Sequence, residues 1–179
     1  MALGFGICLL VNLLASLPAA AQGSATAATA APSRCSEALL RVWGFEVYTA
    51  RLCAGEGFRA DAYARSSFTL ELRYLRAFKA ADIARRSIEE MRRSGPLDDA
   101  QARAWRELLE RTLPDVQPGD RITGIHEPGR GVRFLYNGQP RGGPVGDAVF
   151  AERFFGIWLA PQTSEPALRE ALLAPLGAS

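Results

Sequence analysis

The segment 68–74 constrains the fold more than any other stretch of the chain, because its side chains alternate strictly between apolar and polar. Apolar side chains occupy every second position from Phe68 to Tyr74, and Thr, Glu and Arg occupy the positions between them. A strand with this pattern buries one face and exposes the other to water. The sequence therefore predicts a half-buried strand in a sheet that has one wet face.

After this strand the hydrophobic period changes to that of a helix. Between residues 80 and 93 apolar side chains recur at three- and four-residue spacings, with Arg and Glu on the other faces, which is typical of an amphipathic helix. Ser-Gly-Pro at 94–96 ends this helix. A second helix is predicted to begin after Asp98 or Asp99, either of which can cap it, and to end at Pro114.

Three further segments are predicted to be strands. Residues 39–52 are rich in β-branched and aromatic side chains and predict extended chain, in which Gly44 marks a bend or a bulge. Residues 121–126 and 132–136 predict two strands joined by a glycine-rich turn, and Asn137-Gly138 is a hairpin signal after the second.

Two more helices are predicted near the C-terminus. Asp147 can cap the first of them, and Thr163 or Ser164 can start the last, with Pro166 in its first turn. The order is strands, two helices, a hairpin and two helices. Antiparallel strands with segregated helices predict one α+β domain.

The N-terminal segment carries no charged side chain before Arg34. Residues 5–17 form an apolar run that is shorter than the ~20 residues needed to span a bilayer. Small residues follow at 18–22, in the pattern of a signal-peptidase site. We interpret residues 1–21 as a secretory signal peptide that is cut after Ala21.

This interpretation divides the chain into three parts. The signal peptide is followed by a flexible leader over residues 22–35, rich in Ala, Ser and Thr, and by a folded domain over residues 36–176. The predicted location is the periplasm or the exterior of a bacterium, with no stable membrane anchor after cleavage. An uncleaved anchor is the alternative.

Cysteine usage depends on the same interpretation. Cys8 lies within the apolar run, so removal of the signal leaves Cys35 and Cys53. In an oxidising compartment these two residues can form a disulfide, and two separate thiols are the alternative. A zinc site is not expected, because the chain has one His and no Cys-x-x-Cys.

Charge and motif content exclude several classes of partner. With 21 basic and 19 acidic residues the net charge is +2, which does not suggest nucleic acid as a partner. The glycine clusters at 128–131 and 141–144 are interpreted as turns rather than phosphate loops, so no cofactor is expected. His126 near a strand end is expected to be solvated or hydrogen-bonded rather than catalytic. The side chains assigned to a solvated face of the first helix are Arg85, Arg86, Glu89, Glu90, Arg92 and Arg93.

Arg and Tyr on the predicted strands are the candidate binding residues. An Arg beside a Tyr hydroxyl can clamp a carboxylate, and the same pair can polarise an enone or stabilise an oxyanion. Arg41, Tyr48, Arg73 and Tyr74 are the candidates. Arg41 and Tyr48 are an odd number of residues apart, so they share a face only if Gly44 is a bulge. The alternative is that each Tyr packs in the core and each Arg lies at the rim.

Six segments spread in order over residues 36–174 carry a family resemblance. They are 44–52, 68–74, 87–91, 118–124, 134–138 and 150–159, of which the last contains Phe-Phe-Gly-Ile-Trp-Leu. Together they resemble the chalcone isomerase-like family, in its secreted bacterial branch. The resemblance implies an open-faced β-sandwich, in which a large antiparallel sheet is backed by helices with a ligand cleft between them.

The same resemblance implies what the site residues do. Tyr48 resembles the Tyr with which fatty-acid-binding members hold a carboxylate, and its Arg partner is either Arg34 or Arg41. The helical Tyr and Asn of the plant chalcone isomerases fall near residues 82–83 and 89–90, where this chain has neither. We therefore expect no true chalcone isomerase activity.

Three functions remain as hypotheses. The favoured one is binding of a small amphipathic or fatty-acid-like carboxylate in the cleft. The second is an isomerase or intramolecular lyase acting on an enone. The third is a non-catalytic structural or interaction protein whose cleft is plugged by Phe154, Phe155 and Trp158.

Overall fold

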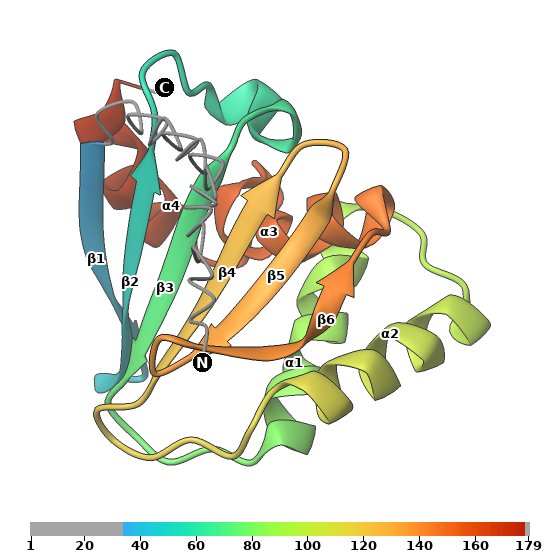
Figure 1. The fold of residues 1–179 in the computed structure, drawn as a ribbon. Helices are drawn as coiled ribbons and strands as arrows, with labels where there is room; N and C mark the ends of the chain where they lie inside the picture. Colours follow the sequence, from blue (N-terminus) through green and yellow to red (C-terminus); the bar gives the residue numbers. More distant parts are fainter. Residues whose placement is uncertain (1–33, 178–179) are drawn as a thin grey trace, which may run out of the picture.

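A six-stranded antiparallel sheet with its helices on one face forms the frame of the molecule (Figure 1). The computed structural model describes residues 34–177. Each strand pairs with the next in sequence order. The strands are β1 (Arg34–Val42), β2 (Phe45–Ala54), β3 (Phe68–Tyr74), β4 (Arg121–Glu127), β5 (Gly131–Tyr136) and β6 (Gln139–Val145). The α-helices are α1 (Ala80–Met91), α2 (Asp99–Thr112), α3 (Ala148–Leu159) and α4 (Pro166–Leu173), and short 3-10 turns lie at 60–65, 92–94 and 174–176. This is the α+β fold that the sequence predicts.

The alternation in β3 decides which face of the sheet the helices cover. Phe68, Leu70, Leu72 and Tyr74 are all buried, whereas the residues between them are half-buried or exposed. The buried positions pack against the helical layer, which gives one continuous core. The prediction of a strand with one wet face is therefore confirmed.

The segment 39–52, predicted to be extended chain with a bend or a bulge at Gly44, contains parts of two strands, β1 and β2. Trp43 and Gly44 form the turn between β1 and β2. Both have positive φ (50° and 82°), as a two-residue type I′ hairpin turn requires. The irregularity in the ladder lies between Leu40 and Arg41 rather than at Gly44. Trp-Gly lacks the Asn or Asp that usually signals such a turn, so sequence reasoning missed it.

Two other strand predictions need correction at the edges of the sheet. β1 begins at Arg34, within the stretch predicted to be the end of the leader. Residues 139–145, part of which was predicted to be a turn, form β6 at the opposite edge. Two prolines are tolerated there because an edge strand has one side without ladder partners. The predicted signal peptide and residues 22–33 lie outside the described part of the chain.

Helix starts follow the predicted capping chemistry at two of three positions. The carboxylate of Asp98 accepts from the backbone N–H groups of residues 100 and 101 at the start of α2. Asp147 accepts from the N–H of Phe150 at the start of α3 and also from the Trp105 indole, at 3.1 Å. In α4, Glu165 rather than Thr163 or Ser164 precedes the first helical residue, Pro166. The Thr163 hydroxyl accepts from the backbone N–H of Glu165, at 3.2 Å.

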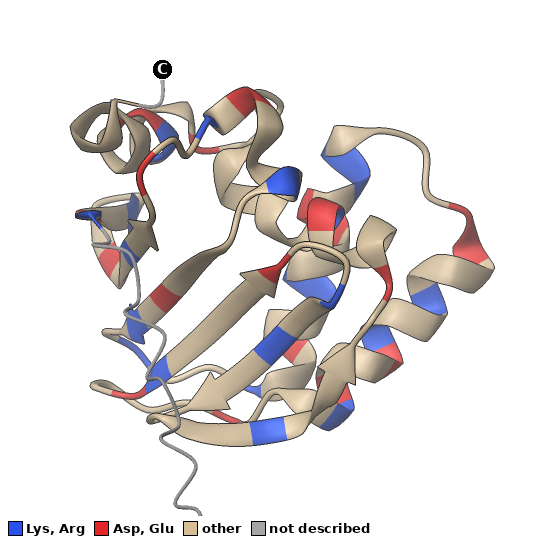
Figure 2. Cartoon of the chain, turned by 45° about the horizontal axis from the view of Figure 1, so that its top comes forward, with Lys and Arg blue, Asp and Glu red and all other residues tan. Residues whose placement is uncertain are grey.

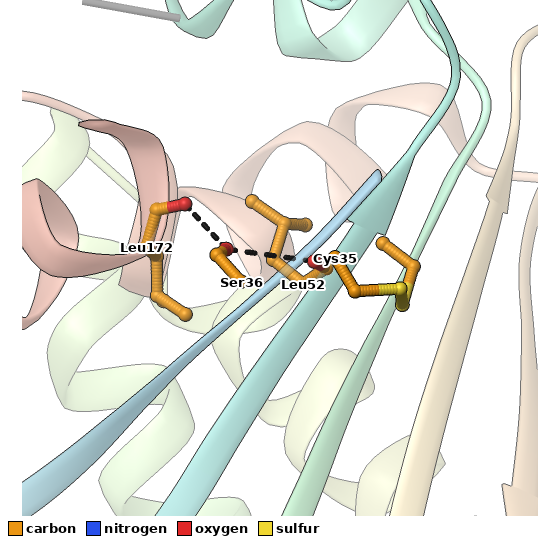
Figure 3. Close-up of a disulfide and its surroundings, with 5 residues drawn as sticks. Cys35, Ser36, Leu52 and Leu172 are labelled. Carbon is orange, nitrogen blue, oxygen red and sulfur yellow. Dashed lines mark hydrogen bonds between the residues drawn. A yellow bond between two sulfur atoms is a disulfide. The ribbon is translucent and has the colours of Figure 1, made fainter. Parts of the chain in front are cut away.

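At the start of β1, a disulfide and two hydrogen bonds hold the edge of the sheet in place. Cys35 and Cys53 face each other across β1 and β2 and form a disulfide, with a Cα–Cα distance of 4.1 Å. The Ser36 hydroxyl donates to the carbonyl of Leu172 in α4, at 2.5 Å (Figure 3). Arg34 donates to the carbonyl of Leu176 at 2.8 Å. These bonds fasten the edge strand to its neighbour and to the C-terminal helix.

Aromatic side chains fill the space between sheet and helices at this end. Phe155 of α3 meets Phe68 and His126 at centroid distances of 4.7 Å and 5.4 Å. Gly124 on β4 makes room for them, because an added Cβ there would lie 3.0 Å from the Phe155 ring. We call this region, from the disulfide to the Phe155 ring, the closed end.

Charged residues of both signs are interspersed over the helices and strands (Figure 2). No helix within residues 34–177 combines the length and the apolar character needed to cross a bilayer.

Candidate functional site

A cavity of about 310 Å³ lies between the sheet and the helices at the opposite end of the molecule. This volume is near the lower limit of typical small-ligand pockets, which range from ~300 to ~1,000 Å³. We call this region the open end. Its apolar lining comes from Leu40, Val42, Val47, Leu72, Tyr74, Phe78, Ile83, Leu113, Ile122, Phe154, Ile157 and Leu168. Its polar lining comes from Tyr48, Asp82, Arg85, Arg86, Ser87, Glu90, Trp158, Ser164 and Glu165.

Tyr48 supplies a hydroxyl to the cavity from β2. The strand register places it opposite Leu40 on one side and Tyr74 on the other, and its ring meets the Tyr74 ring edge-on at 6.0 Å. The Tyr48 oxygen accepts a hydrogen bond from the indole N–H of Trp158, at 2.9 Å. That bond uses a lone pair and leaves the phenolic proton available to donate to a ligand.

Burial strengthens the preference of the Tyr48 hydroxyl for its protonated form. Loss of solvation raises its pKa above the ordinary value of 10.0, and the charges of Glu165 and Glu90 raise it further. The indole hydrogen bond and the Arg86 charge lower the pKa in the opposite direction. Tyr48 is therefore a neutral donor at physiological pH, and Arg86 lines the same cavity.

Arg86 on α1 is the basic residue that best fits a carboxylate-binding role in this cavity. Its Nη2 contacts Glu90 Oε1 at 2.6 Å, and its Nη1 lies 3.6 Å from Glu89 Oε2. The Arg86 side chain is 62% exposed, whereas that of Glu90 is 7% exposed. A guanidinium has five N–H donors in a planar fork, so these two contacts leave donors free for a ligand carboxylate.

The neighbouring charges on α1 share partners with Arg86, because Glu89 contacts both Arg85 and Arg86. Arg85 contacts Asp82 at 3.4 Å and Glu89 at 2.9 Å. Glu90 Oε2 is buried and has no hydrogen-bond partner within residues 34–177, with Arg93 Nε at 3.8 Å. The predicted solvated face of this helix is thus correct for Arg85 and Glu89 and wrong for Glu90.

None of the three strand-borne arginines predicted for the site lines the cavity. Arg41 pairs with Glu46 at 2.7 Å on the exposed side of the hairpin. Arg34 lies at the closed end on Leu176. Arg73 is exposed between two buried positions of β3, so it points to the wet face. Of the predicted binding residues, the structure brings together Tyr48 and Tyr74 only.

Sequence reasoning missed Arg86 because it treated the charged residues of the helix as one solvated group. A signal was present in the helical phase. Glu90 lies seven residues after Ile83 and three after Ser87, so it falls on the buried stripe of the helix. A carboxylate on that stripe requires a basic partner, and the residue one turn earlier is Arg86.

The aromatic residues of α3 are divided between the two ends. Phe154 and Trp158 line the cavity without filling it, and Phe155 packs at the closed end. The plug predicted by the third hypothesis is therefore not formed by these side chains.

The remaining candidates for chemistry lie away from the cavity. His126 is buried, stacks on Phe68, and its Nδ1 lies 2.7 Å from the carbonyl oxygen of Ser66. It is hydrogen-bonded, in agreement with the prediction. Within residues 34–177 no group of three or more His, Cys, Asp or Glu side chains could hold a metal ion.

Comparisons with known proteins agree with this architecture. A crystal structure of a fatty-acid binding protein of Arabidopsis thaliana superposes with a TM-score of 0.61 at 13% identity, covering 82% of this chain and 88% of that one. An uncharacterised protein of Haemophilus influenzae is 30% identical over 132 residues, which are 73% of this chain and 63% of the relative. This chain thus spans less than two thirds of that relative's length. The sequence profile of the chalcone isomerase-like family matches residues 38–174. The chain belongs to the chalcone isomerase-like family.

Proposed function

We propose that this protein binds a small amphipathic carboxylate of the fatty-acid type in the open end, without catalysing a reaction on it. The observation that carries the proposal is the pairing of an apolar cavity with a neutral phenol donor, Tyr48, and a partly free guanidinium, Arg86. A few placed polar groups in an apolar pocket are the usual design of a small-molecule site.

The lining gives the ligand an orientation. Polar side chains come mainly from α1, and the strands contribute mainly apolar ones. The carboxylate would accept hydrogen bonds from Tyr48 and Arg86, which are stronger for a charged acceptor than for a neutral one. The hydrocarbon part would lie along Leu40, Leu72 and Ile122. A cavity of about 310 Å³ favours a ligand of modest length over a long one.

The Arabidopsis protein with the similar fold is a fatty-acid binding protein, which supports this ligand class. At 13% identity the similarity is one of fold alone. The enone hypothesis has less support, because His126, the one His of the chain, is engaged with the Ser66 carbonyl away from the cavity. A chalcone absorbance assay with the purified protein tests it, and we expect no turnover above the spontaneous rate.

The affinity for saturated fatty acids of increasing chain length can be measured by isothermal titration calorimetry. Arg86→Gln should lower the affinity by about tenfold, because a hydrogen bond to a charged group contributes roughly 1.5–3 kcal/mol. Arg92→Gln is the matched control, since Arg92 pairs with Asp99 at 2.9 Å and does not line the cavity. Absence of binding by the wild type, or equal losses in the two variants, would contradict the proposal.

We further propose that the chain is secreted into the periplasm through the signal peptide at residues 1–21. The Cys35–Cys53 disulfide supports this, because such bonds persist in oxidising compartments. Cell fractionation followed by intact-mass measurement tests it. A periplasmic product that begins at Gln22 is expected, and a cytoplasmic product with an intact N-terminus would overturn the proposal.

A further inference from the structure

The turn that joins β1 and β2 exposes an unusual amount of apolar surface. Within residues 34–177, the exposed large hydrophobic side chains are Val42 at 37%, Trp43 at 95%, Phe45 at 60% and Val149 at 52%. Three of these four lie within four consecutive residues, which we call the hairpin tip (residues 42–45). Clustered exposed apolar side chains mark an interaction site rather than ordinary surface.

No contact within residues 34–177 explains why the turn has a Trp at position 43. Trp43 has a φ of 50°, a conformation that is unfavourable for a bulky side chain and that Asn, Asp or Gly adopts more readily. The indole is almost fully in water, so packing does not compensate. A Trp held in this way is better explained by something that it contacts outside the chain.

The hairpin tip is continuous with the open end. Val42 belongs to the tip and also lines the cavity, together with Leu40 and Val47 from the same two strands. The tip lies at the end of the sheet away from the C-terminus (Figure 1). Val42 therefore connects the exposed Trp43 with the apolar lining of the cavity.

A basic side chain accompanies the aromatic ones. The guanidinium carbon of Arg76 lies 4.9 Å from the centre of the Phe45 ring. No carboxylate within residues 34–177 lies within 4.0 Å of Arg76, whereas Arg41 on the same hairpin is paired with Glu46. The tip thus presents aromatic rings beside an unpaired positive charge.

We propose that the hairpin tip docks on an anionic phospholipid bilayer, with Trp43 and Phe45 in the interfacial layer and Arg76 at the lipid phosphates. Aromatic side chains favour this layer, and a basic residue near the surface adds affinity for anionic lipids. A stable protein–protein interface buries ~800 Å² on each partner, and a two-residue turn with three apolar side chains is too small for that. Docking brings the cavity beside the lipid, so an amphipathic ligand can pass between them without crossing water.

The intrinsic fluorescence of the full chain provides a direct test. Of its three Trp residues, Trp105 and Trp158 are 5% and 6% exposed, so Trp43 reports on contact with lipid. The probe is a vesicle of phosphatidylglycerol mixed with phosphatidylcholine brominated near the headgroup end of its acyl chains. We expect a blue shift and strong quenching for the wild type, and neither for Trp43→Phe.

A second variant moves the fluorescent Trp from the hairpin tip to another exposed position. Trp43→Phe combined with Val149→Trp places an indole at the remaining exposed apolar position, on α3, and should show no quenching. Quenching of this variant equal to that of the wild type, or no quenching of the wild type, would overturn the proposal. Because the vesicles carry no added ligand, this result is independent of whether the cavity binds a carboxylate.

The charge contribution is tested separately. Arg76→Gln should lower the apparent affinity for the anionic vesicles by about fivefold, as expected for one basic residue at an anionic surface. Arg103→Gln, an exposed arginine on α2, is the matched control and should bind like the wild type. Equal affinities for the two variants would remove Arg76 from the proposed contact.

Discussion

The two ends of the space between the sheet and the helices are built from the same strands but are packed differently. At the closed end, aromatic rings from β3 and α3 meet over Gly124, and a disulfide fastens the edge strand. At the open end, the sheet and α1 stay far enough apart to leave a cavity of about 310 Å³. The contrast leads us to expect that packing at the closed end supports stability and that a ligand would occupy the open end. Changes at the closed end should therefore affect stability, and changes at the open end should affect ligand affinity.

The largest effect on stability is expected from the disulfide. It closes a loop with a sequence separation of 18 residues, so replacing Cys35 and Cys53 by Ser should cost about 3 kcal/mol in the free energy of unfolding. Urea denaturation measures this cost. Reductant should destabilise the wild type and leave the variant unchanged. A loss of ligand affinity as large as the loss of stability would break the proposed division between the two ends.

Overpacking at the closed end should have the next largest effect. Gly124→Ala places a methyl group 3.0 Å from the Phe155 ring, and such crowding in a packed core costs about 1–3 kcal/mol. Gly143→Ala is the control, because its Cβ would meet nothing within 4 Å. Thermal denaturation of the two variants measures the difference, and equal melting temperatures would show that the closed end can expand.

Removal of the Tyr48 hydroxyl at the open end should lower both the stability of the fold and the affinity for a carboxylate. Tyr48→Phe leaves the indole N–H of Trp158 without its acceptor, which should cost about 1 kcal/mol of stability, and it should also weaken carboxylate binding. In Tyr74→Phe the stability loss should be smaller, since within residues 34–177 the Tyr74 hydroxyl has no hydrogen-bond partner. Denaturation and titration of both variants separate the two roles. A larger stability loss in Tyr74→Phe would contradict this assignment.

Filling the cavity should cost little stability. Ser87 lines the cavity, and within residues 34–177 its hydroxyl donates only to the carbonyl of Ile83, in its own helix. Ser87→Leu adds apolar volume where there is room, so the free energy of unfolding should stay within about 1 kcal/mol of the wild type or rise. Fatty-acid affinity should fall sharply. Retained affinity would place the ligand elsewhere.

The smallest expected effect is the response to alkaline pH. Burial raises the pKa of Tyr48 and of Tyr74, and it raises that of Tyr63 to about 12. Because unfolded Tyr ionises near pH 10, these groups stabilise the fold fully below about pH 10, and the stability is lost as pH rises above it. Urea denaturation across this range should show the decline. A double variant, Tyr48→Phe with Tyr74→Phe, should decline less steeply.

Much of the fold could be predicted from local patterns. The alternation in β3 and the helical period of α1 report which side chains face the core, because each pattern repeats within a single element. The Asp98 and Asp147 caps were predictable for the same reason, since each acts within its own helix. The turn at Trp43 and the edge strand β6 were not, because neither has the composition that usually accompanies such structures.

The candidate site residues also show the limit of local sequence patterns. Tyr48 was predicted as a site residue, and the cavity contains it. Its partner was sought among arginines near it on strands, whereas the cavity has Arg86, which comes from α1 across the sheet–helix interface. Sequence proximity could not identify that residue, because the distance between a strand and a covering helix depends on how their side chains pack.

The sequence by itself determined the α+β class, the buried face of β3, and the presence of a Tyr on the strand that borders the cavity. Only the tertiary structure decided which arginine accompanies that Tyr and which end of the core stays open. The physical reason is the range of the interactions involved. Periodicity and capping act over a few consecutive residues, whereas a cavity depends on side-chain volumes from strands and helices that are distant in the sequence.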